Sequence, residues 1–189
     1  MVDARILNTA AALNAAVIAL ASATPISRIT VADVTRAAQI NRATFYSHYT
    51  SPSALLAHVL SADLEQIRTA DNQERASGDR PAALITRQSV VDSVRHVARF
   101  RDIYRLALTD ASDGTTHHVL AASFYGSCLT HLRNSVSPEE IPGDIELVAA
   151  YVANGLVGAI EAAASSEHWD ESGLTDLLMA MLPSWWDRA

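Results

Sequence analysis

The sequence predicts an all-α protein. Apolar residues recur three or four positions apart along most of its 189 residues, and no stretch alternates at period two for long enough to form a strand. Three helix starts, each with its own capping residue, also follow one another closely between residues 29 and 56. Nearly half of the residues are apolar, which suffices for one sizeable core or two small ones.

A first helix is expected to cover the alanine-rich apolar run at residues 10–23 and to include Ile6 and Leu7, which share its spacing. The end of this run, residues 21–23, imitates a secretory cleavage site, but Asn14 interrupts the run, which is also too short to span a bilayer. The apolar positions recur at the spacing of an amphipathic helix, as Leu13, Val17 and Leu20 do. We therefore interpret the run as the first helix of a cytoplasmic protein without a membrane segment.

Thr30 and Ser51 mark two of the three helix starts. Thr30 and Asp33 have the spacing of a capping box, with an acid at the positive end of the helix dipole, and they predict a helix over 31–38. Ser51 precedes Pro52, and a proline at the first helical position loses no hydrogen bond. A longer helix, the last of the three in this stretch, is therefore expected to begin at Pro52.

Asn41 is the third cap, and the helix that it opens at Arg42 follows the previous one after a break at residues 39–40. Two helices joined so tightly cross steeply, which is the geometry of a helix-turn-helix whose second helix enters the major groove of DNA. Phe45 and Tyr49 stand four residues apart and predict the face toward the core. The side chains left for base edges and phosphates are Arg42, Ala43, Thr44, Tyr46, Ser47 and His48.

This stretch resembles the DNA-binding domain of the TetR (tetracycline-repressor-like) family of bacterial transcriptional regulators. The family's pattern is matched by Thr30, Val31, Val34, Ala38, Ile40, Thr44, Phe45, Tyr46, His48, Tyr49, Ser51, Leu55 and Leu56. The resemblance implies an N-terminal three-helix helix-turn-helix domain and a larger C-terminal helical domain for ligand binding and dimerisation. It also implies a homodimer that binds double-stranded DNA at a palindromic operator and releases it when a small-molecule ligand binds. Thr30 is then a further DNA-binding residue.

The sequence departs from the family's pattern at two positions. Gln39 stands where the family usually has a glycine in the turn, and a non-glycine residue at positive φ costs roughly 1 kcal/mol. Pro52 stands where the family usually has a lysine that binds phosphate. The second change predicts one backbone contact fewer, and with it a lower affinity and a weaker salt dependence.

The charge of the chain is unevenly distributed. The formal net charge is −7, which is unusual for a protein that binds nucleic acid. Residues 1–62, however, carry four arginines against two aspartates, a net charge of +2, whereas the remainder carries ten arginines against nineteen acids, a net charge of −9. The positive part is the one that holds the helix-turn-helix pattern.

The rest of the chain also reads as helices. The helix that starts at Pro52 is expected to fade near Asn72, and the polar segment Glu74–Pro81 follows it. Further helices are expected at 82–99, 101–110, 115–135, 145–167 and 173–182. The expected organisation is a DNA-binding domain at 1–50, a linking helix at 51–73, and a ligand-binding and dimerisation domain at 74–189.

Two helices near the C-terminus predict the dimer interface. They combine an apolar stripe with small residues that let a second helix approach closely. A protein that binds a palindromic operator also needs two-fold symmetry. We therefore expect a four-helix interface. Its expected residues are Tyr151, Gly155, Gly158, Ala159, Ala162, Leu174, Leu178 and Met181.

A ligand pocket is expected between the middle helices of the body. The candidate lining residues are aromatic or mildly polar, although each fits an ordinary core equally well. They are Phe100, Tyr104, Phe124, Cys128, His131, Tyr151 and Asn154. Cys128 is the only cysteine, which excludes an internal disulfide and fits a reducing compartment.

Other classes of site find little support in the sequence. His117 and His118 point about 100° apart on a helix, and His131 lies more than three turns away, so we expect no metal site. No glycine-rich phosphate loop, Cys-x-x-Cys pair or Gly-x-Ser-x-Gly elbow is present, so neither an enzyme nor a cofactor is expected. The alternative function is a helical adaptor or membrane-surface protein, suggested by the alanine-rich first helix and the Trp185-Trp186 pair.

Overall fold

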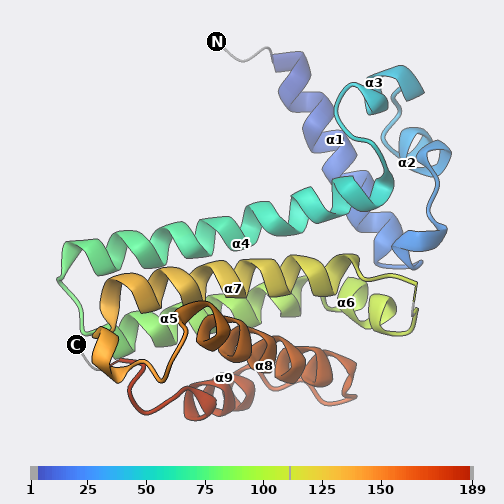
Figure 1. Cartoon of the computed structure of the whole chain (residues 1–189). Coiled ribbons are helices and arrows are strands. Elements are labelled where there is room, and N and C mark those ends of the chain that lie inside the picture. The colour runs from blue at the N-terminus through green and yellow to red at the C-terminus, as the bar shows by residue number, and fades with distance from the viewer. Residues whose placement is uncertain (1–3, 111, 188–189) are drawn as a thin grey trace. The chain divides into compact units, whose positions relative to one another are not determined.

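The computed structural model describes residues 4–110 and 112–187, and every regular element in those ranges is helical, which confirms the all-α prediction (Figure 1). The elements are α1 (Ala4–Ala21), the 3-10 helix η1 (Ile26–Arg28), α2 (Val31–Ala37), α3 (Arg42–Tyr46), α4 (Pro52–Ser77), α5 (Ala82–Arg99), α6 (Arg101–Leu108), α7 (Thr115–Ser135), the 3-10 helix η2 (Pro138–Glu140), α8 (Ile145–Ser165) and α9 (Glu171–Met181).

These helices form two compact units. The first unit comprises the chain up to Ser61 together with Phe100–Thr116, and the second comprises Ala62–Arg99 and the chain from His117 onward. The helix α4 begins in the first unit and ends in the second without a break in its helical backbone.

The first unit is built on α1. This helix packs against α2 and α6, and α2 packs in turn against α3. The apolar stripe predicted for the first helix supplies two fully buried side chains, Leu13 and Val17, and Val34 and Phe45 join the same unit's core from α2 and α3. Burial of this stripe explains why an alanine-rich segment folds as a helix with one inward face.

The second unit is organised around α5, which packs against both α8 and α9, while α8 also contacts α9. By length and composition α8 is the one helix in the described ranges that is apolar enough to cross a membrane. A core helix of a globular protein passes the same test. Seven residues of α8 are indeed buried within the chain, among them Ala153, Val157 and Ile160.

One helix boundary differs clearly from its prediction. The helix α4 was expected to fade near Asn72, but it continues to Ser77. Its extension is held by an ion pair between Asp71 and Arg75, one turn apart, in which Arg75 Nε donates at 2.8 Å. Arg75 also donates to the hydroxyl of Thr86 on α5 at 2.9 Å, so tertiary contacts stabilise the last turns of a polar segment.

The turn between α2 and α3 contains the strained residue that the sequence predicted. Gln39 has φ of 54° and is the only non-glycine residue with positive φ in the described ranges. Its N–H donates to the carbonyl of Arg36 at 3.3 Å, and that of Ile40 donates to the carbonyl of Thr35 at 3.0 Å. These two bonds form a Schellman motif, in which the left-handed position usually holds glycine.

Replacing Gln39 by glycine is expected to stabilise the first unit by about 1 kcal/mol, because glycine adopts the left-handed conformation without the Cβ clash. Gln39→Ala is the matched control, since it shortens the side chain but keeps the Cβ atom. Urea unfolding followed by far-UV circular dichroism measures both. If the alanine variant gains as much stability as the glycine variant, the strain does not lie in the backbone of this residue.

Candidate functional site

The caps of α2 and α3 adopt the predicted geometry. The Thr30 hydroxyl accepts from the N–H of Asp33 at 3.2 Å, and the Asp33 carboxylate accepts from the N–H of Thr30 at 3.1 Å, which is a complete capping box. The Thr30 hydroxyl also donates to the Asp33 carboxylate, and this bond, together with the one from the Thr30 N–H, lowers the pKa of Asp33. Asn41 caps α3 by accepting from the N–H of Thr44 at 2.7 Å. The helix-turn-helix is therefore fixed at both of its helix starts.

The inner face of α3 rests on aromatic side chains. Phe45 is fully buried, and its ring centroid lies 6.3 Å from that of Tyr49. The ring centroid of Tyr49 lies in turn 5.5 Å from that of His58 on α4. The N-terminus of α4 is held nearby, because the Ser51 hydroxyl accepts from the N–H of Ala54 at 3.0 Å. The short helix α3 thus owes its orientation to packing rather than to its own length.

The opposite face of the segment is open to solvent. Arg42, Ala43, Ser47 and His48 are exposed, and Tyr46 retains 60% of its accessible surface. Arg42 takes part in none of the ion pairs among the described residues, so its guanidinium group remains available.

Two of the predicted DNA-binding residues are placed differently from the rest. Thr44 is half-buried, and its carbonyl oxygen accepts from the Ser47 hydroxyl at 2.7 Å. Thr30 is exposed, but its hydroxyl both donates to and accepts from Asp33 within the cap. Its clearest role is therefore to hold α2 in place.

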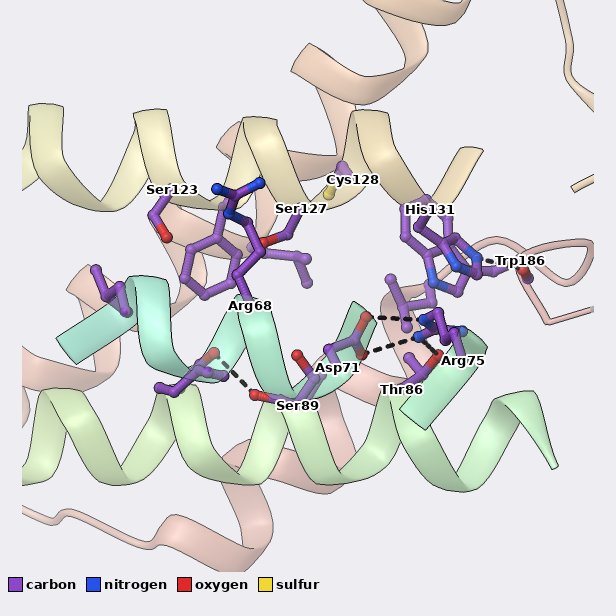
Figure 2. A pocket seen from close by; sticks show the side chains of 17 residues that line it. Arg68, Asp71, Arg75, Thr86, Ser89, Ser123, Ser127, Cys128, His131 and Trp186 are labelled. Atoms are coloured by element: carbon purple, nitrogen blue, oxygen red, sulfur yellow. Dashed lines mark hydrogen bonds and ion pairs between the residues drawn. The ribbon is translucent and has the colours of Figure 1, made fainter. Parts of the chain in front are cut away.

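A cavity lies within the second unit, between α4, α5 and α7, and its volume is about 70 Å³ (Figure 2). Three of the seven predicted pocket residues, Phe124, Cys128 and His131, line it from α7. Burial raises the pKa of Cys128 to about 12, so this thiol stays neutral and takes no part as a thiolate.

The other four predicted pocket residues lie elsewhere. Phe100 and Tyr104 are buried in the first unit and do not line this cavity. Tyr151 is 82% exposed on α8, and Asn154 is exposed on the same helix, where its amide donates to the carbonyl of Ala150. None of these four is among the residues that line the cavity of the second unit.

Much of the polar wall of the cavity comes from residues that the sequence did not place in a pocket. Asp71 and Arg75 form their ion pair on α4, and Arg75 donates to Thr86 of α5. The Thr86 hydroxyl donates to Asp187 at 2.7 Å. The C-terminal segment also contributes Trp186, whose ring stacks on His131 with centroids 4.5 Å apart. One chain of polar contacts thus joins two helices and the C-terminal segment.

The predicted interface residues divide into two groups. Tyr151, Gly155, Gly158, Ala162 and Met181 are exposed and Ala159 is half-buried, whereas Leu174 and Leu178 lie in the core of the chain at 7% and 1% exposure. These two leucines are corrections to the predicted surface, because α9 turns them inward toward its own unit.

The exposed surface of α8 and α9 also carries two large apolar residues that the interface prediction did not include. Leu147 of α8 is 72% exposed, and Leu177 of α9 is 52% exposed. A Cβ atom added at Gly155 or Gly158 would meet nothing within 4 Å, so the face is open at both glycines.

A buried histidine pairs with an acid near the start of the second unit. His96 of α5 is 2% exposed, and its Nδ1 lies 2.6 Å from the Asp63 carboxylate, which also pairs with Arg99. Burial lowers the pKa of His96, and the contact with Asp63 offsets only part of that effect. Burial also lowers the pKa of His131. Both rings are therefore neutral in the folded chain near pH 7.

Acidification is expected to destabilise the second unit below about pH 6.5. The folded-state pKa values of His96 and His131 are lowered, so the unfolded chain takes up protons first. The stability that these groups contribute is present above the unfolded pKa of about 6.5 and is lost as the pH falls toward the folded values. Urea unfolding at pH 7.5, 6.5 and 5.5 measures how steeply the free energy of unfolding changes with pH.

The matched variants for this pH series are His96→Gln and His168→Gln, which remove a buried and an exposed histidine respectively. The first should reduce the pH dependence and the second should leave it unchanged. An unaltered slope in His96→Gln would show that other groups cause the acid sensitivity.

No group of three or more His, Cys, Asp or Glu side chains in the described part of the chain could hold a metal ion. His117, one of the histidines weighed in the sequence, lies on the surface of the second unit with its Nδ1 2.9 Å from Glu161.

Comparison with solved structures identifies the fold. A TetR transcriptional regulator from Streptococcus agalactiae 2603V is 19% identical, the match covers 94% of each chain, and the TM-score is 0.61. The fatty acid degradation regulator FadR from Bacillus halodurans is 10% identical, with 92% of this chain and 93% of that one covered and a TM-score of 0.63. The dihydroxyacetone kinase operon activator DhaS is 15% identical, with 91% and 94% covered and a TM-score of 0.63. No protein-family model and no curated protein matches the sequence.

Proposed function

We propose that the chain, which has the two-part helical fold of TetR-type regulators, is a cytoplasmic, sequence-specific DNA-binding transcriptional regulator. It acts as a homodimer that represses from a palindromic operator and is released by a small molecule bound in the cavity of the second unit. The observation that carries the proposal is the exposed, unpaired Arg42 at the start of a helix whose opposite face is locked by Phe45.

The side chains on α3 and just after it are expected to make different DNA contacts, according to their size and charge. Arg42 has a forked cation that reaches a guanine edge, and guanine is the commonest specific partner of arginine. Tyr46 and His48 are better suited to phosphates beside the groove. The positive charge of residues 1–62 supports phosphate binding, and the acidic remainder discourages unspecific adhesion to DNA.

Arg42→Ala is expected to cost about 1–3 kcal/mol on a palindromic duplex selected from a random library, with a much smaller loss on random DNA. Base readout is what this variant removes. Tyr46→Phe removes one hydroxyl and no charge, so it should weaken binding to both duplexes alike and leave the salt slope nearly unchanged. Anisotropy titrations of both variants on both duplexes at several salt concentrations measure these losses.

Equal losses for Arg42→Ala on the two duplexes would mean that Arg42 only holds the backbone and that Thr44 and Ser47 carry the readout. Failure to select any duplex, combined with tight binding to anionic vesicles, would favour the membrane-surface alternative.

The proposed dimer uses the open face of α8 and α9. The side chains of Leu147, Tyr151, Leu177 and Met181 are large, apolar and at least half exposed, which is unusual for a monomer surface. The open positions at Gly155 and Gly158 allow a second copy of α8 to approach closely. A two-fold symmetric dimer contains two copies of α3, one for each half of a palindrome.

The proposed ligand response requires that the ligand favours the state with low operator affinity. A coupling on the order of 1–3 kcal/mol between ligand and operator is typical of such regulators. It appears as a 5- to 150-fold change in operator affinity when the cavity is saturated.

A further inference from the structure

Two buried polar atoms of residues that line the cavity have no hydrogen-bond partner among the described residues: Nη1 of Arg75 and Nδ1 of His131. The rest of the Arg75 guanidinium is already used. Its Nε and Nη2 donate to Asp71 at 2.8 and 3.1 Å, and Nη2 donates to Thr86 at 2.9 Å. Nη1 alone keeps its N–H donors without an acceptor, which is costly for a buried group.

His131 supplies an atom of the opposite kind. Its Nε2 lies 2.8 Å from the carbonyl oxygen of Trp186, which only accepts, so the geometry assigns the proton of the neutral ring to Nε2. Nδ1 then carries a lone pair and needs a donor. The indole of Trp186 stacks on the imidazole and fixes the plane of the ring.

The cavity has one polar end. Arg75, Thr86, His131 and Trp186 gather there, whereas Ser123 and Arg68 lie toward the other end (Figure 2). Both arginines that line the cavity already have an acidic partner, Arg75 in Asp71 and Arg68 in Glu65, so the feature that an anion can use is the free Nη1 of Arg75. Most of the remaining wall is apolar and consists of Leu64, Ile67, Val90, Phe124, Leu156 and Leu182. A volume of about 70 Å³ has room for several water-sized groups, which suits a short ligand.

We infer that this cavity binds a small monocarboxylic acid, with the carboxyl group between Arg75 and His131 and the apolar part against Phe124. The inference rests on the proposed function, because it names the chemical class of the ligand that releases the operator. One carboxyl oxygen accepts from Nη1 of Arg75, which is the strongest pairing open to a guanidinium donor. The other oxygen shares a proton with Nδ1 of His131, so that each buried atom gains its missing partner.

The acid therefore binds together with one proton. The charged groups around His131 are Asp71 and Arg75 on α4 and Asp187 in the C-terminal segment. The nearby Cys128 on α7 stays a neutral thiol, because burial raises its pKa to about 12. Asp71 is already neutralised by Arg75, so the proton taken up with the ligand goes to the new carboxyl–imidazole contact.

Isothermal titration of the full chain with matched pairs tests the inference: hexanoate against hexanamide, and benzoate against benzamide, at pH 6.5 and 7.5. The acids should bind at least tenfold more tightly than their amides, and their affinity should rise about tenfold between pH 7.5 and pH 6.5, as uptake of one proton requires. Amides that bind as tightly as the acids overturn the inference. So does the absence of acid binding at millimolar concentration.

Variants locate the binding group. Arg75→Gln should abolish the preference for acid over amide, whereas Arg68→Gln, the matched control, should preserve it because Arg68 is paired with Glu65. Circular dichroism checks the fold of each variant. His131→Gln provides an independent readout, since it should remove the pH dependence of acid binding. An acid preference that survives both Arg75→Gln and His131→Gln overturns the assignment.

The titrations need no DNA, so they separate this inference from the proposed function. Binding of hexanoate by a chain that selects no duplex would support the acid site and contradict the proposed regulatory function. Release of the selected duplex by hexanamide as well as by hexanoate would support the regulatory function and contradict the assignment of the ligand as an acid.

Discussion

Gly158→Trp is expected to convert the dimer into monomers that remain helical but lose operator binding. Gly158 is exposed, and no neighbouring atom of the described residues lies within 4 Å of a Cβ atom built there, so the monomer has room for a larger side chain on this face, whereas a partner helix packed against it does not. Overpacking costs about 1–3 kcal/mol per side chain, and a two-fold symmetric interface contains the substituted side chain twice. The dissociation constant of the dimer should rise by roughly two orders of magnitude or more.

Analytical ultracentrifugation at micromolar concentration, with circular dichroism on the same samples, measures both parts of this result. Gly126→Trp is the matched control, because Gly126 is a helical glycine on α7 with open space at its Cβ position. The control should remain a dimer. A Gly158→Trp protein that sediments unchanged would place the interface on another face.

Phe45→Ala is expected to have the largest effect on stability, about 3–5 kcal/mol. The side chain is fully buried in a small unit, and it contacts both Tyr46 and Tyr49. Its loss should release α3 from the unit and abolish DNA binding, although Phe45 itself faces away from the predicted DNA surface.

Urea unfolding followed by far-UV circular dichroism measures this loss. Tyr46→Ala is the control for stability, since Tyr46 is 60% exposed and its truncation should stay within about 0.5 kcal/mol. A cost below 1 kcal/mol for Phe45→Ala would mean that the orientation of α3 depends on contacts other than this ring.

Local features of the fold were predictable because their causes lie within a few residues. The capping box at Thr30 and the cap at Asn41 satisfy backbone groups three residues away. The positive φ at Gln39 was expected from the resemblance to the TetR pattern, which usually has a glycine at this position of the turn. The helix start at Arg42, which such a cap governs, agrees with the structure to the residue.

The composition of the cavity was less predictable, because its polar wall joins residues far apart in sequence. Thr86 meets Asp187, and His131 meets Trp186, through contacts that no local spacing indicates. The only visible signal was the four-residue spacing of Asp71 and Arg75.

The apolar stripe of α9 shows a second limit of sequence patterns. Periodicity showed that Leu174 and Leu178 are buried by something, but it could not distinguish the chain's own α5 from a second copy. An apolar stripe is therefore evidence of burial and not of the identity of the partner.

The stacking of Trp186 on His131 gives the protein an optical reporter. All three tryptophans, Trp169, Trp185 and Trp186, belong to the second unit, so tryptophan emission follows that unit alone. Far-UV circular dichroism, in contrast, records the helices of both units. A denaturation experiment that records both signals therefore distinguishes one cooperative transition from two, and an emission change without a change in ellipticity marks an event at the cavity.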